Sequence, residues 1–246
     1  MIALRKMAWV ELKLFLREPL TVVFALVLPL IILVVMSAVF GNTPDPEFYR
    51  GYGPVDFYTP AYIGLVVGAV GVVSIPVHLA GNRERGVLRR FRASSVPLGV
   101  VVGAEALVSL AIALVSSVVL AVCAMLGYDV GGPASPLLLV AAFLWTALMF
   151  AALGVMLGSL IPTARAAQAA GMLLWFLMLM MGGAGPPPET LTGVLGLLAH
   201  AVPLTYACRL LQEAWLEGGW AWADAGIVAA IGVAASLVTI RLFRWE

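Results

Sequence analysis

The side chains able to engage a partner or do chemistry are concentrated in one short stretch, 82–97, which reads NRERGVLRRFRASSVP. This basic segment lies between two long apolar runs and holds five of the fourteen basic residues of the chain: Arg83, Arg85, Arg89, Arg90 and Arg92. Because almost everything else is apolar, the basic segment is the place where a soluble partner could bind.

Glu84 is the unusual residue of the basic segment. If 83–94 forms a helix, Val87, Leu88 and Phe91 make an apolar stripe, and Glu84 projects from its middle, one turn before Leu88. A helix lying only on lipid would not place a carboxylate there. A helix docked on protein could, if Glu84 met an arginine or the N-terminal end of a neighbouring helix, and the N-terminal segment is the predicted neighbour.

Other reactive groups are sparse. A phosphate-binding loop needs a lysine after glycine, and the only lysines, Lys6 and Lys13, do not follow one. His78 and His200 are far apart in the chain, with no companions spaced as metal ligands. We found no GxSxG motif and no paired carboxylates in an apolar run, which disfavours a membrane-embedded enzyme.

Glu105 is the one acidic residue well inside an apolar run. Proton-driven carriers keep ionisable groups near the midplane of the membrane, and their scarcity here argues against a proton antiporter. The favoured interpretation of Glu105 is an interfacial acid near the start of a helix.

Composition defines the class of fold. The 246 residues are 63% hydrophobic and 11% charged, with a mean hydropathy of +1.06, whereas a soluble domain is roughly half apolar and about a quarter charged. A membrane-spanning helix needs about 20 apolar residues. The sequence predicts an all-α polytopic membrane protein, a single domain over 1–246, with six spans at about 20–40, 58–80, 98–126, 137–160, 166–181 and 223–240.

Two further segments have helical patterns but are not predicted to span. Residues 1–18 place Lys6, Lys13 and Arg17 on one face beside an apolar strip, which is typical of a helix lying in the membrane interface. The alternative is a plain positively charged flank. Residues 189–201 follow the sequence GGAGPPP and are too short to cross, so we expect a re-entrant or interfacial helix on the outer side.

Small and aromatic residues suggest local contacts. Gly64-x-x-x-Gly68 and Gly154-x-x-x-Gly158 are spacings that allow close helix packing, within or between protomers. Trp215, Trp220 and Trp222 are expected to form an interfacial aromatic cluster.

The distribution of lysine and arginine predicts the orientation. With six spans, twelve of the fourteen basic residues fall on the side of the N-terminus, and only Arg50 and Arg209 fall on the other. The positive-inside rule then places both termini in the cytoplasm.

Two stretches resemble the permease subunits of ABC-2 type exporters. NRERGVLRRFRASSVPLGVVVGAE is similar to that family's connection between spans two and three, with Glu84, Arg85 and Gly86 as its acid–basic–Gly part. PLTYACRLLQEAWLEGG, 203–219, resembles the family's Pro-Leu-Thr-Tyr stretch before the last span. The order of segments also matches, although the triple proline 186–188 departs from the family's usual Gly/Pro turn.

The resemblance implies a half-transporter in a bacterial or archaeal cell membrane. It would form a homodimer and bind two copies of a separate ATPase subunit, which would hold ATP and magnesium; this chain would need no cofactor and bind no nucleic acid. By the same resemblance, the coupling residues on the cytoplasmic side would be Glu84, Arg85, Gly86, Val87, Leu88, Phe91, Lys6, Lys13 and Arg17.

The resemblance also implies a cargo cavity between protomers, lined by spans two and five. Flexible methionines and aromatic rings suit a bulky, partly apolar compound such as a drug, antibiotic or lipid. The expected lining residues are Met172, Trp175, Phe176, Met178, Met180 and Met181. Ordinary packing or lipid contact is the alternative for each of them. Export of a lipid-linked glycan or an ion, and a scaffold without cargo, remain open as alternative functions.

Overall fold

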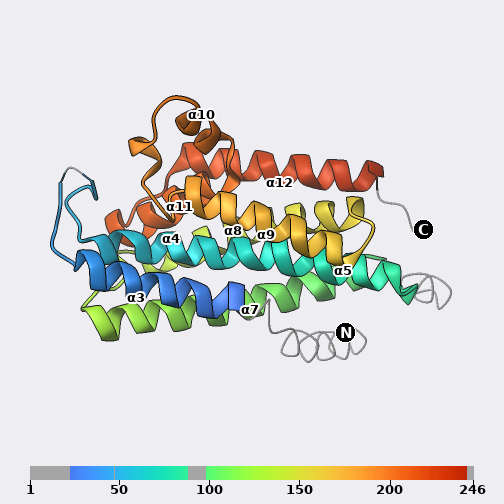
Figure 1. The fold of residues 1–246 in the computed structure, drawn as a ribbon, viewed down its shortest axis with the longest axis horizontal. Coiled ribbons are helices and arrows are strands. Elements are labelled where there is room, and N and C mark those ends of the chain that lie inside the picture. The colour runs from blue at the N-terminus through green and yellow to red at the C-terminus, as the bar shows by residue number, and fades with distance from the viewer. Residues whose placement is uncertain (1–22, 47, 88–97, 243–246) are drawn as a thin grey trace.

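The fold is a bundle of membrane-length helices (Figure 1). The computed structural model describes residues 23–46, 48–87 and 98–242, and every regular element in these ranges is a helix. Six of them are long and apolar enough to cross a membrane, and a bent pair near the C-terminus would make a seventh if it were one span. The predicted all-α polytopic fold is confirmed.

The six spans are built as follows. The first is η1 (Val23–Val27) with α3 (Leu28–Phe40), and the second joins α4 (Pro54–Ala69), the π-helical η2 (Val70–Ser74) and α5 (Ile75–Glu84). The others are α7 (Leu98–Tyr128), α8 (Pro136–Leu160), α9 (Ala164–Met181) and α12 (Trp222–Leu242).

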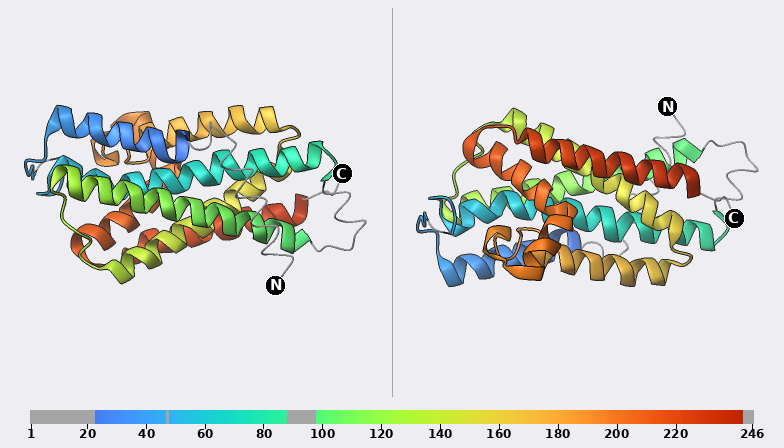
Figure 2. Two further views of the ribbon diagram at one scale, coloured as in Figure 1. Left: turned by 90° about the horizontal axis from the view of Figure 1, so that it is seen from below. Right: turned by 90° about the horizontal axis from the view of Figure 1, so that it is seen from above.

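The second span is the centre of the bundle (Figure 2). In its most apolar window 94% of the residues are buried, against 17–39% in the other five spans. It is also longer than the predicted 58–80. It starts earlier because Pro54 occupies the first turn and the Asn42 side-chain oxygen accepts hydrogen bonds from the backbone N–H groups of Val55 and Asp56.

Glycines bring the neighbouring helices against the second span. A methyl group at Gly154 would lie 2.2 Å from the carbonyl oxygen of Gly71, and one at Gly158 would lie 3.0 Å from Cβ of Leu79. Gly64 faces the side chains of α11, with Leu211 at 3.3 Å. The predicted close contacts therefore occur, and these lie within one chain.

The segment between α9 and α12 is folded into short pieces. It contains the 3₁₀ turn η3 (Pro188–Thr190), α10 (Gly193–Ala201), α11 (Pro203–Gln212) and the π-helical η4 (Glu213–Glu217). The helix α10 is bent by 77° from the α11–η4 helix. Its nine residues are too few to cross a bilayer, as predicted for 189–201.

The predicted tryptophan cluster is only partly present. Trp220 and Trp222 pack with ring centroids 6.2 Å apart, and Trp222 is 81% exposed. Trp215 is instead 3% exposed and belongs to the core, because η4 turns its side chain into the bundle. The prediction of three interfacial tryptophans is therefore wrong for Trp215.

Charged residues divide between the two ends of the bundle. One end, here called the basic end, gathers the last turns of α5, α8 and α12 with the first turn of α9 (Figure 1), and carries Arg83, Arg85, Arg165 and Arg241. The opposite acidic end has, among the described residues, two arginines and seven acids: Arg50, Arg209, Asp45, Asp56, Asp129, Glu189, Glu213, Glu217 and Asp224.

Candidate functional site

The basic segment is divided at Gly86, just after the end of α5. The helix ends at Glu84, and Gly86 has φ +67°, a left-handed conformation that stops the helix before Val87. The expected continuous helix over 83–94 is therefore wrong at Gly86, and the predicted stripe partners of Glu84 include Leu88 and Phe91. The latter two lie outside the described residues, as do Lys6, Lys13 and Arg17.

Glu84 does meet the N-terminal end of a helix. Its Oε2 accepts a hydrogen bond of 3.1 Å from the backbone N–H of Ala164, the first residue of α9. The first N–H groups of a helix lack intrahelical partners and carry partial positive charge, so a carboxylate stabilises them. This helix is α9 rather than the predicted N-terminal segment, which lies outside the described residues.

Arg83, the residue before Glu84, binds the C-terminal end of a helix. Its guanidinium donates to the carbonyl oxygen of Ser159 at 2.6 Å and also to that of Ile161, both at the C-terminus of α8. These carbonyls carry partial negative charge. Arg85, which follows Glu84, is exposed, and its guanidinium donates to the Asn82 side chain one turn earlier.

His78 and Glu105 connect the second and third spans near the basic end. Nδ1 of His78 lies 3.7 Å from Oε1 of Glu105, and both side chains are buried. The sequence predicted Glu105 as an interfacial acid near the start of a helix and did not predict His78 as its partner. Sequence reasoning missed the pair because the two residues lie in helices separated by the basic segment.

The predicted cargo residues of α9 lie on different faces of that helix. Trp175 is 2% exposed, donates to the carbonyl oxygen of Leu65 at 3.2 Å, and meets the ring of Phe24 edge-on at 5.0 Å. Phe176 and Met180 point outward, and Met172 is half-buried.

Met178 and Met181 face a cavity of about 420 Å³ beside α9. Its walls come from α8, α9 and η2 on one side and from α10 with the bend before α11 on the other. Every lining side chain is apolar, among them Met156, Leu157, Met178, Met181, Leu198 and Val202. This volume is within the range of small-molecule pockets, which run from about 300 to 1,000 Å³.

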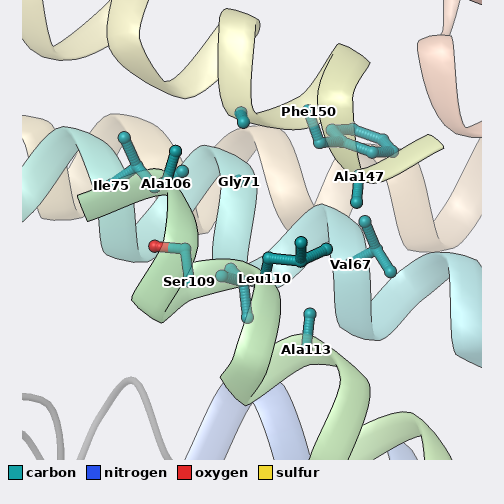
Figure 3. Close-up of a pocket in the computed structure, with 11 residues that line it drawn as sticks. Val67, Gly71, Ile75, Ala106, Ser109, Leu110, Ala113, Ala147 and Phe150 are labelled. Atoms are coloured by element: carbon teal, nitrogen blue, oxygen red, sulfur yellow. The ribbon is translucent and has the colours of Figure 1, made fainter. Parts of the chain in front are cut away.

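A second void lies deeper, beside the π-helical turn (Figure 3). It is bounded by Val67 and Gly71 of the second span, Ser109 of α7 and Phe150 of α8, and its volume is about 20 Å³. That is room for about one water molecule. It is too small to hold a cargo molecule.

Ion pairs hold the acidic end. Glu189, just before α10, lies 3.1 Å from Arg209 of α11 and 3.7 Å from Arg50 in the loop before α4. The hydroxyl of Tyr52 donates to Glu217 at 3.0 Å, and burial followed by this carboxylate raises the pKa of Tyr52 above its ordinary value. Tyr52 therefore stays protonated and able to donate at neutral pH.

In the described part of the chain there is no group of three or more histidine, cysteine, aspartate or glutamate residues that could hold a metal ion. What the structure does contain is a helical bundle of membrane length, an apolar cavity and a charged helix junction at one end. These features define a multi-pass membrane protein.

Comparison with protein families identifies the family to which this membrane protein belongs. The family model described as ABC-2 type transporter matches residues 3–216, which is most of the chain, so the chain belongs to this family. It is a membrane permease component of an ABC transporter, and the family implies an ATPase partner. The comparison with curated proteins gave no match.

Proposed function

We propose that this permease is the membrane half of an ATP-driven exporter for a hydrophobic or amphipathic compound, such as a drug, an antibiotic or a lipid. The observation that carries this proposal is the cavity of about 420 Å³ with its wholly apolar lining. An ion or a glycan requires polar groups to replace its water shell, and this lining offers none. An apolar compound requires only the exclusion of water.

The energy source would be a separate ATPase subunit. The chain has no glycine–lysine pair for a phosphate-binding loop, so nucleotide and magnesium would bind to the partner. Two copies of that partner would serve a homodimer of the permease. The cytoplasmic face would be the basic end of a bacterial or archaeal inner membrane, because arginines accumulate on the cytoplasmic side of spans.

Two adjacent methionines give a matched test of the cavity. Met181→Trp should fill part of it and reduce ATP-driven transport of bulky lipophilic dyes more than transport of small ones, because the added ring occupies the same space. Met180→Trp is the control, since Met180 does not line the cavity and its side chain is 40% exposed. Equal effects of the two variants on every dye would contradict a cargo role for the cavity.

The motor partner is tested by purification from the native membrane. The tagged permease should carry a nucleotide-binding subunit with it, and ATP hydrolysis by the complex should respond to dye. Glu84→Ala should leave insertion and dimerisation unchanged and lower transport per ATP hydrolysed, because it removes a contact at the expected ATPase side. A permease that purifies alone, without a nucleotide-binding subunit and without ATPase activity in the purified sample, would contradict the proposal.

A further inference from the structure

The short turn between α8 and α9 is held from both sides by two consecutive residues of α5. Arg83 binds carbonyl oxygens at the end of α8, and Glu84 binds the first N–H of α9. The sign of each charge matches the helix end that it contacts, positive on the C-terminus and negative on the N-terminus. Hydrogen bonds to charged groups are the stronger class, so the turn is bound to α5 more firmly than by packing alone.

Below this junction, α8 and α9 both make close contacts with the backbone of η2, the π-helical turn that continues into α5. A methyl group at Gly154 of α8 would lie 2.2 Å from the carbonyl oxygen of Gly71, and one at Gly171 of α9 would lie 2.3 Å from that of Val72. Side chains cannot rearrange to relieve contacts made by backbone atoms. The second half of span two therefore fits between α8 and α9 with little freedom to slide.

η2, α8 and α9 also form one wall of the apolar cavity, and α5 is the direct continuation of η2. Val72 of η2, Leu153 of α8 and Met178 of α9 all line it, whereas Leu198 of α10 and Pro203 of α11 line the opposite side. A displacement of the end of α5 would therefore move one wall of the cavity as a unit.

We propose that Arg83 and Glu84 are positioning residues that lock the α8–α9 turn to α5, so that movement of the basic segment reaches the cavity wall. This rests on the proposed function, in which the basic end faces the cytoplasm and the ATPase subunit. Arg83 has a role here that its charge alone does not predict, since any arginine at this end would satisfy the positive-inside rule.

The first measurement needs no ATPase and no cargo. In the purified full chain, Arg83→Met should speed amide hydrogen exchange in the α8–α9 turn about tenfold or more, the scale expected when a charge-assisted hydrogen bond is lost. The matched control is Arg85→Met, which removes an exposed arginine that donates within its own helix. Unchanged exchange in Arg83→Met, or an equal change in both variants, would contradict the proposal that Arg83 holds the α8–α9 turn on α5.

The second measurement asks whether the lock reaches the cavity. With Met181→Cys in a Cys123→Ser background, Arg83→Met should raise the rate of maleimide labelling severalfold, and Arg83→Lys should restore part of the original rate because lysine still donates to a carbonyl. If hydrogen exchange rises at the turn while maleimide labelling stays constant, the proposal that the turn controls the cavity wall is wrong. Neither measurement uses nucleotide, so failure of ATP-driven transport would leave both results interpretable.

The order of the two charges provides a further check. Arg83→Glu combined with Glu84→Arg keeps the net charge but places each sign on the wrong helix end, so exchange at the turn should exceed that of Arg83→Met alone. Exchange at the wild-type level in this double variant would overturn the role of helix-end charge.

Discussion

At the basic end, charged side chains of α5 bond directly to the backbone of the α8–α9 turn, whereas at the acidic end the position of α10 depends on ion pairs between Glu189 and two arginine side chains. Arg83 and Glu84 bind carbonyl and N–H groups that have no intrahelical partner, so their geometry is fixed by the helices. Glu189 joins Arg50 and Arg209, all three of them partly open to solvent. Such exposed pairs contribute little and weaken with salt.

The difference indicates which end moves as one body. Backbone contacts at Gly154 and Gly171 join three helices below the basic end. At the acidic end α10 has nine residues and is joined to α11 at a 77° bend. We infer that a rearrangement of the cavity would involve displacement of α10 rather than separation of α5, α8 and α9.

The largest effect is expected for Gly154→Ala. The new methyl group would meet the carbonyl oxygen of Gly71 at 2.2 Å, and overpacking of this kind costs about 1–3 kcal/mol of unfolding free energy or more. The midpoint of thermal unfolding in detergent should fall by several degrees. The control is Gly103→Ala, where nothing lies within 4 Å and alanine favours the helix. Equal midpoints for the two variants would contradict the backbone contact.

A smaller effect is expected for Trp175→Phe in the middle of the bundle. It keeps the ring against Phe24 but removes the hydrogen bond to Leu65, and one such bond is worth about 1 kcal/mol. The thermal midpoint should fall modestly, while Trp222→Phe, at a side chain 81% exposed, should change it less. A selective change in dye transport with no change in midpoint would instead favour direct cargo contact by Trp175.

The smallest effect on stability is expected for Glu189→Gln at the acidic end. It removes both ion pairs, but each partner is partly exposed, so the loss should stay below about 1 kcal/mol and shrink as salt is added. Thermal midpoints measured across a series of salt concentrations check this. A loss as large as that of Gly154→Ala, unchanged by salt, would show that the two ends are held in the same way.

Several features of the candidate site could be anticipated from the sequence and several could not. Gly86 is a local signal for the helix boundary, because glycine is the usual residue in a left-handed helix end, but the apolar pattern around it predicts a helix that continues. The partner of Glu84 had no local signal, because Ala164 is eighty residues away and contributes only a backbone N–H. The same is true of His78 and Glu105, which pair across two spans.

By itself the sequence determined the class of fold, the approximate positions of the six spans, the short helix before α11 and the family resemblance. The reason is that lipid requires long apolar helices, whose length and composition are visible one segment at a time. Only the tertiary structure decided that Trp215 and Trp175 are core residues, that Met178 and Met181 share a cavity while Met180 does not, and that Arg83 and Glu84 hold a distant turn. Nearly every face of these helices is apolar, so hydrophobicity does not distinguish lipid, neighbour and cavity, and only packing assigns each face to one of them.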